Sequence, residues 1–207
     1  MVKVKICGIT NLEDAFNSIE AGYDALGFIF YKKSPRYITP QKASQIIRHL
    51  PSDILKIGVF VNAQEKTIRR TAELCNLDML QFHGDESPEF CARFKGYKII
   101  KAFRLKNRID TANILNYRTF AYLFDTFVKA KVGGTGKKFN WALLRHLGSF
   151  HKPVFLSGGL DAQNVLEAIE KVRPEWVDVS SSVEISPGKK DSKKVREFIK
   201  TVKNSAF

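Results

Sequence analysis

The sequence lacks the features that mark secreted and membrane proteins. No apolar run in its 207 residues reaches the length of a membrane-spanning helix, and the N-terminus lacks a signal-peptide pattern. Its three cysteines, Cys7, Cys75 and Cys91, are odd in number and lack the spacing of metal ligands. A disulfide framework and a metal site are therefore not expected. We expect a cytoplasmic protein with reduced thiols.

Acidic residues are scarce relative to basic ones, 21 against 34, which gives a formal net charge of +13. Such a charge can mark a nucleic-acid-binding protein or an enzyme that attracts an anionic substrate. The basic residues are scattered, and no zinc finger, RNA-binding aromatic motif or basic arm accompanies them. We interpret the charge as a solvated surface with some electrostatic steering, and expect neither a nucleic-acid nor a membrane partner. Binding that survives a rise in salt would favour the nucleic-acid alternative.

A regular alternation of short apolar runs and helix-like segments is present instead. Apolar runs typical of strands occupy residues 2–7, 25–30, 56–61, 79–83, 98–105, 121–125, 153–157 and 176–180. No linker or low-complexity tract separates them, and no dinucleotide-binding fingerprint is present. An open doubly wound sheet is the alternative. Eight compact strand–helix units favour an α/β fold with a single (β/α)8 TIM barrel over residues 1–207.

Several polar residues stand where the predicted helices begin. Thr10 with Glu13 three residues later predicts a capping box after the first strand. Thr39 and Asn62 are each predicted to cap a later helix, and either Asp191 or Ser192 is predicted to start the last one, because their side-chain oxygens can accept hydrogen bonds from exposed backbone N–H groups.

The first strand carries two candidate site residues, Lys5 and Cys7. Alternation along a strand places both on one face, and Cys7 is the last residue before Gly8. An isolated cysteine is more often a small buried hydrophobe. In a barrel, however, the active site lies at the carboxyl ends of the strands.

Other polar residues stand at the ends of later strands. They are Gln81, His83, Asp125, Asp178, Ser180, Ser181 and Ser182. Each could simply cap a barrel layer or a helix. A thiol, an imidazole and a carboxylate that converge on one end of the barrel favour an active site.

Glycines and serines follow the last two strands. Gly158 and Gly159 come after the seventh strand, and Ser180 and Ser181 after the eighth. Backbone N–H groups at these two loops often bind phosphate in such barrels. We therefore expect a phosphorylated substrate.

Ordered motifs along the whole chain resemble those of the phosphoribosylanthranilate isomerase family of tryptophan biosynthesis. They are residues 5–10 (KICGIT), 27–30 (GFIF), 34–38 (SPRYI), 58–62 (GVFVN), 81–84 (QFHG), 133–136 (GGTG), 157–160 (SGGL), 178–181 (DVSS) and 187–191 (PGKKD). Any one of the shorter motifs would be weak evidence. Their common order makes the resemblance specific.

The resemblance implies an Amadori rearrangement of N-(5'-phosphoribosyl)anthranilate to 1-(2-carboxyphenylamino)-1-deoxyribulose 5-phosphate, without cofactor or metal. It implies that Cys7 is the general base, that Asp125 is the general acid, and that Arg36 grips the anthranilate carboxylate. The implied substrate-binding residues are Lys5, Arg36, Gln81, His83 and Asp178, and the implied phosphate-binding residues are Gly134, Gly158, Gly159, Ser180 and Ser181. Members of this family occur as monomers and homodimers, so either state is expected.

Two departures and two open questions accompany this resemblance. Family members usually have glycine at Ser182 and often aspartate at Asn140. The alternative is another phosphate-binding barrel, such as a sugar-phosphate epimerase or a histidine-pathway aminoaldose isomerase. For the latter, aspartate rather than Cys7 would be expected on the first strand. Lys5 is expected either to lower the pKa of the Cys7 thiol or to contact the substrate or a neighbouring carboxylate.

Overall fold

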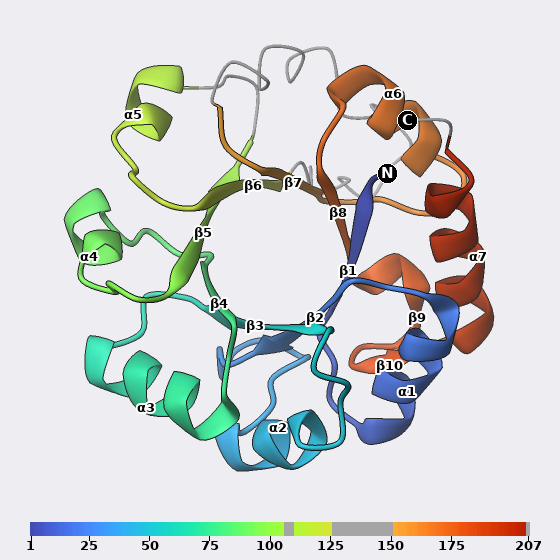
Figure 1. The fold of residues 1–207 in the computed structure, drawn as a ribbon, viewed down its shortest axis with the longest axis horizontal. Helices are drawn as coiled ribbons and strands as arrows, with labels where there is room; N and C mark the ends of the chain where they lie inside the picture. The colour runs from blue at the N-terminus through green and yellow to red at the C-terminus, as the bar shows by residue number, and fades with distance from the viewer. Residues whose placement is uncertain (106–109, 126–150, 206–207) are drawn as a thin grey trace.

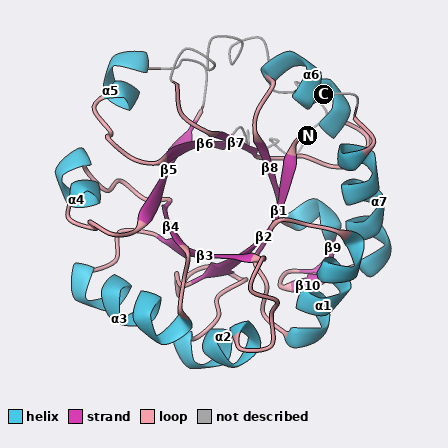
Figure 2. Ribbon diagram, viewed as in Figure 1, coloured by secondary structure: helices cyan, strands magenta, loops and turns pink. Residues whose placement is uncertain are grey.

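The computed structural model describes residues 1–105, 110–125 and 151–205, and shows a ring of parallel strands surrounded by helices (Figures 1 and 2). The strands are β1 Lys3–Cys7, β2 Ala25–Ile29, β3 Leu55–Phe60, β4 Met79–Phe82, β5 Lys98–Arg104, β6 Ala121–Asp125, β7 Val154–Ser157 and β8 Trp176–Val179. They pair in this order, and β8 pairs with β1 to close the barrel. The expected TIM barrel is confirmed.

Helices cover the outside of the ring. They are α1 Leu12–Ala21, α2 Pro40–Ile47, α3 Glu65–Cys75, α4 Pro88–Ala92, α5 Thr111–Leu115, α6 Val165–Val172 and α7 Ser192–Lys203. Within the described ranges, no helix is long and apolar enough to cross a membrane.

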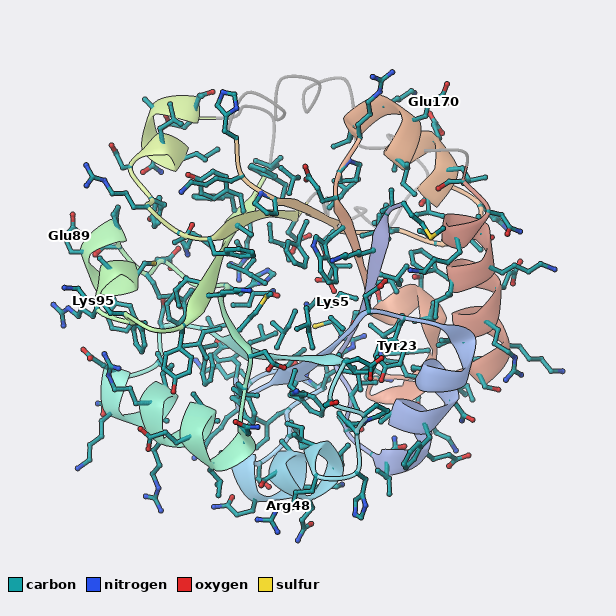
Figure 3. The ribbon with its side chains drawn as sticks, in the orientation of Figure 1. Lys5, Tyr23, Arg48, Glu89, Lys95 and Glu170 are labelled. Atoms are coloured by element: carbon teal, nitrogen blue, oxygen red, sulfur yellow. The ribbon has the colours of Figure 1, made fainter. Side chains whose placement is uncertain are left out.

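Strand alternation divides the apolar residues into two cores. Val4 and Ile6 of β1 belong to the larger core, which includes buried residues of the covering helices, whereas Lys5 lies inside the ring of strands (Figure 3). A smaller cluster inside the barrel includes Phe155 and Trp176, whose rings stack with centroids 4.8 Å apart. Inside the barrel, a packed apolar cluster therefore lies below the polar residues at the carboxyl ends of the strands.

The predicted capping box after β1 is wrong by one residue. Asn11 accepts a hydrogen bond from the backbone N–H of Asp14 at 2.8 Å, and its amide donates to the Asp14 carboxylate at 2.8 Å. The Thr10 hydroxyl instead donates to the carbonyl of Gly188 at 2.5 Å. Thr10 therefore joins the first loop to the last part of the chain.

Of the other predicted helix caps, two are confirmed and one is wrong. Thr39 caps α2 and Asp191 caps α7, each accepting backbone N–H groups as predicted. Asn62 does not cap α3, because its side-chain oxygen accepts the N–H of Asp85 at 2.7 Å and its own backbone is left-handed. Asn62 thus joins the loops after β3 and β4.

A hairpin that the sequence did not predict follows β8. A short 3-10 turn, η3 Ser181–Val183, leads into β9 Glu184–Ser186, which pairs antiparallel with β10 Lys189–Lys190. The hairpin lies beside α1 (Figure 1). Besides the Thr10 contact, the backbone N–H of Lys190 donates to Asp14 at 2.8 Å. The last loop of the barrel is therefore fastened to the first.

Candidate active site

Lys5 and Cys7 lie together inside the barrel, at the seam between β1 and β8. Lys5 Nζ is 3.0 Å from Asp178 Oδ1, and the two side chains are 0% and 5% exposed. A Cβ at Gly27 of β2 would be 2.7 Å from Cys7 Sγ and 3.1 Å from Lys5 Cε. Glycine at position 27 therefore makes room for both side chains.

The protonation of this group follows from its burial. Burial raises the pKa of the Cys7 thiol, and although Lys5 and Lys190 both act to lower it, the pKa stays above the ordinary thiol value. Burial would lower the pKa of Lys5, but the Asp178 carboxylate and the Cys7 sulfur outweigh it and raise that pKa. Lys5 therefore acts on the thiol in the predicted direction without bringing it to neutrality. It also contacts a neighbouring carboxylate, as the alternative expected.

Gln81, His83 and Asp125 form a hydrogen-bonded chain at the ends of β4 and β6. Gln81 Nε2 lies 2.9 Å from His83 Nδ1, and His83 Nε2 lies 3.3 Å from Asp125 Oδ2. When the Gln81 amide donates to Nδ1, Nε2 carries the proton and donates to the carboxylate. If that amide is turned over, its oxygen accepts from Nδ1–H instead. His83 Nε2 then carries no proton and can accept a hydrogen bond from a protonated Asp125. The chain therefore suits both protonation states of Asp125.

Gln81 also holds a buried polar atom without a hydrogen-bond partner among the described residues. Its side chain is buried, and no donor among the described residues reaches Oε1. A buried acceptor of this kind is costly unless something binds it.

Arg36 lies across the turn that follows Cys7. Its Nε is 2.9 Å from Glu184 Oε1, and its Nη2 is 2.6 Å from Oε2. Gly8 has φ +83°, and a Cβ there would be 2.7 Å from Arg36 Cδ. Glycine is required at position 8 because the turn is left-handed and the arginine passes directly over it.

Lys190 joins the same group from the hairpin. Its Nζ lies 2.6 Å from the Cys7 carbonyl oxygen, 3.2 Å from that of Ser180 and 2.8 Å from Glu184 Oε1. Sequence reasoning missed Glu184 and Lys190 as site residues. The PGKKD motif that contains Lys190 was the available signal for the lysine, whereas no local pattern links Glu184 to Arg36.

The predicted phosphate loops lie side by side after β7 and β8. Gly158 and Gly159 both have positive φ, and both are accessible to solvent. The Ser180 hydroxyl donates to the Cys7 carbonyl at 3.1 Å, and the Ser182 hydroxyl donates to the carbonyl of Leu160. Ser182 thus ties the two loops together. Gly134, like Asn140, lies outside the described residues.

Cavities open at both ends of the barrel. One of about 780 Å³ opens at the amino ends of the strands, where Leu55, Met79 and Trp176 line it. His83 borders a smaller cavity of about 350 Å³ at the carboxyl ends. Within the described ranges, no three His, Cys, Asp or Glu side chains are grouped to hold a metal ion. The titratable groups converge at the carboxyl ends, which is where barrels of this kind place their chemistry.

Comparison with known proteins shows the family of this chain. A family model for N-(5'-phosphoribosyl)anthranilate (PRA) isomerase matches residues 4–201. The isomerase of that name from Pelobacter propionicus is 48% identical over 205 residues, which are 99% of this chain and 97% of that protein. The crystal structure of phosphoribosyl anthranilate isomerase from Thermotoga maritima is 46% identical, covers 98% of this chain and 99% of its own, and has a TM-score of 0.91.

A further crystal structure of a phosphoribosyl anthranilate isomerase was solved in complex with reduced 1-(o-carboxyphenylamino)-1-deoxyribulose 5-phosphate. It is 45% identical, covers 98% of this chain and 99% of its own, and has a TM-score of 0.89. Family model, relatives and structures agree over nearly the whole chain. The chain belongs to the N-(5'-phosphoribosyl)anthranilate isomerase family.

Proposed function

We propose that this chain converts N-(5'-phosphoribosyl)anthranilate to 1-(2-carboxyphenylamino)-1-deoxyribulose 5-phosphate, with Asp125 as general acid and Cys7 as general base. The observation that carries the proposal is the presence of both groups at one end of the barrel. Cys7 ends β1 and Asp125 ends β6, and each belongs to a separate polar group that can set its protonation.

The first step requires a proton donor. Protonation of the ring oxygen by Asp125 breaks its bond to C1', opens the furanose and leaves a Schiff base between C1' and the anthranilate nitrogen. The contact between His83 and Asp125 supports this role, because in one tautomer the imidazole accepts the hydrogen bond of the protonated acid.

The second step requires a base. A Cys7 thiolate removes the proton from C2', which gives an enolamine that tautomerises to the ketone. As the ketone forms, C1' gains a proton and the C2' hydroxyl loses one, and transfer of a proton from the Cys7 thiol to the Asp125 carboxylate through solvent restores both groups. C1' is reduced as C2' is oxidised, so no external oxidant or reductant takes part. Burial favours the neutral thiol, and the Lys5 ammonium beside it stabilises the thiolate when it forms.

The remaining residues are assigned to substrate recognition. The planar guanidinium of Arg36 suits the aromatic carboxylate. Lys5, Gln81, His83 and Asp178 are assigned to the ribose part, where the unpaired Gln81 oxygen can accept a hydroxyl hydrogen. The loops with Gly158, Gly159, Ser180 and Ser181 are assigned to the phosphate, together with Gly134.

All of these side chains come from one chain, so the assignment is the same for a monomer and for a homodimer. The test is complementation of a tryptophan auxotroph that lacks this isomerase, combined with turnover by the purified protein. Growth and turnover are expected from the unaltered chain, and turnover should be severely reduced in Cys7→Ala and in Asp125→Asn. Turnover near that of the unaltered chain by one of these variants would remove its residue from the mechanism.

A further inference from the structure

We propose that Glu184 and Lys190 are positioning residues that hold Arg36 for the aromatic carboxylate and keep its surroundings cationic. We call Arg36, Glu184 and Lys190 the Arg36 cluster. The inference rests on the proposed role of Arg36 as the carboxylate-binding residue. It explains how the Arg36 guanidinium is held in one orientation for the substrate carboxylate.

The orientation follows from which nitrogens Glu184 uses. Arg36 Nε lies 2.9 and 3.0 Å from the two carboxylate oxygens, and Nη2 lies 2.6 Å from Oε2. One edge of the guanidinium is therefore bound to Glu184. Among the described residues, nothing accepts a hydrogen bond from Nη1, so the far edge is left to bind a second carboxylate.

Glu184 is itself held rigidly. Its Oε1 also accepts from the backbone N–H of Gly188 at 3.2 Å and from Lys190 Nζ at 2.8 Å, and its side chain is 4% exposed. Burial would raise the pKa of Glu184, but the bonds from Arg36 and Lys190 outweigh it and lower that pKa. The carboxylate therefore stays ionised and fixed. Because it binds one edge of the Arg36 guanidinium, it also fixes the orientation of that side chain.

Lys190 accounts for the charge of the cluster. A lone Arg36–Glu184 pair would be neutral and would attract an anion weakly. The three acceptors around Lys190 Nζ use the three N–H donors that only the ammonium form has. Two cations and one carboxylate leave the cluster with a net charge of +1, which favours a carboxylate ligand.

The Arg36–Glu184 contact is one of several that fasten the hairpin. The Thr10 and Asp14 bonds already join the hairpin to the first loop, and Lys194 Nζ donates to the Glu184 carbonyl at 3.0 Å. A role in substrate binding makes a distinct prediction.

The test is the Kd of two stable ligands. One is reduced 1-(o-carboxyphenylamino)-1-deoxyribulose 5-phosphate, and the other is the same compound without its ring carboxylate. Glu184→Gln and Lys190→Met should each weaken binding of the first ligand by about tenfold, the size expected for loss of one charge-assisted hydrogen bond. Both should leave the second ligand within about twofold.

A double-mutant cycle sharpens the result. In an Arg36→Met background, Glu184→Gln should have no further effect, because its influence passes through the arginine. Asp78→Asn is the matched control, since it removes the partner of the mostly buried Lys56 at the amino ends, 2.8 Å away. It should lower stability without changing either Kd. Glu184→Asp replaces Glu184→Gln if the latter does not fold.

The outcomes are distinct. An unchanged or lower Kd for Glu184→Gln, or an equal loss for both ligands, would overturn the assignment of Glu184. An equal loss for both ligands in Lys190→Met would overturn that of Lys190. Failure of the unaltered chain to turn over phosphoribosylanthranilate would overturn the proposed function instead. Turnover by the unaltered chain, with normal binding by both variants, would overturn the cluster alone.

Discussion

The two proposed halves of the site differ in their access to water. In the base half, Lys5 and Asp178 are 0% and 5% exposed and Cys7 is buried among them. In the acid half, His83 and Asp125 are 19% and 22% exposed. The base half is thus dry and ion-paired, whereas the acid half is partly solvated.

This difference matches what each proposed step needs. A general acid must be reprotonated in every cycle, and contact with water provides that proton. A thiolate in a dry site is a stronger base, but burial makes it harder to form, which is why an ammonium is placed beside it. Two environments within one barrel mouth can hold two groups in opposite protonation states.

Loss of either reacting group should have the largest effect. Cys7→Ala and Asp125→Asn should each lower kcat by roughly a hundred- to ten-thousand-fold, the range of general acid–base groups. The pH profile of residual activity should lose the limb of the removed group and keep the other. Thermal unfolding should remain cooperative in both variants, which is checked by calorimetry. Loss of both limbs of the pH profile in either variant would show that the acid and the base do not titrate as separate groups.

Lys5→Met should have the next largest effect. It leaves Asp178 buried without its cation, which typically costs about 3–5 kcal/mol of unfolding free energy. The pKa of Cys7 should also rise further, because Lys5 acts to lower it. Since the thiolate predominates only above this pKa, activity should rise with pH in the unaltered protein. In the variant the same rise should occur at a higher pH.

The measurement is the rate of iodoacetamide alkylation against pH, with Cys75 and Cys91 replaced by alanine. The midpoint for Cys7 should lie above the ordinary thiol pKa of about 8.5 and move upward in Lys5→Met. Lys101→Met is the matched control, because it breaks another buried pair, 2.9 Å from Glu86, without touching Cys7. An unmoved midpoint in Lys5→Met would show that Lys5 does not act on the thiol.

Gly27→Ala tests how tightly the base half is packed. The new methyl group would meet Cys7 Sγ at 2.7 Å, so the thiol must move, and overpacking typically costs about 1–3 kcal/mol. We expect lower stability together with lower kcat. Gly58→Ala is the control, since its methyl group would meet first Leu77 and then Phe60, the latter at 2.9 Å, on the outer side of β3. Equal kcat losses in the two variants would show that crowding at the thiol is not the cause.

Ser182→Gly should have the smallest effect, because Ser182 lies in neither half. It removes one hydrogen bond to the Leu160 carbonyl, and such a bond contributes about 1 kcal/mol. KM for the phosphorylated substrate should change by less than about threefold. A large rise in KM with unchanged kcat would show instead that this tie shapes the phosphate loops.

The sequence predicts the barrel because its information there is local. Strand alternation and caps such as Thr39 and Asp191 depend on residues within one turn or strand, and the structure confirms them. The β9–β10 hairpin was not predicted, because its strands span only residues 184–186 and 189–190, too short for a visible period. Thr10 was misassigned because a hydroxyl can bond equally well to a distant loop.

The chemistry of the site was predicted less completely than its location. The resemblance implied the roles of Cys7, Asp125 and Arg36. The burial and the hydrogen-bond partners of these residues depend on contacts that no local sequence pattern reveals. Arg36 and Glu184 are 148 positions apart, and a lysine such as Lys190 is normally expected at the surface. The raised pKa of Cys7 likewise depends on burial, which the sequence does not state.

The fastening of the last hairpin to the first strand also sets when the site can form. Lys5 bonds to a partner 173 positions later, and Cys7 to one 183 positions later. A chain emerging from the ribosome cannot make these contacts until Asp178 and Lys190 have been synthesised. Such distant pairings also carry a high cost of loop closure. The thiol therefore stays without its final electrostatic surroundings until these two residues have joined it, and gains them as the barrel closes.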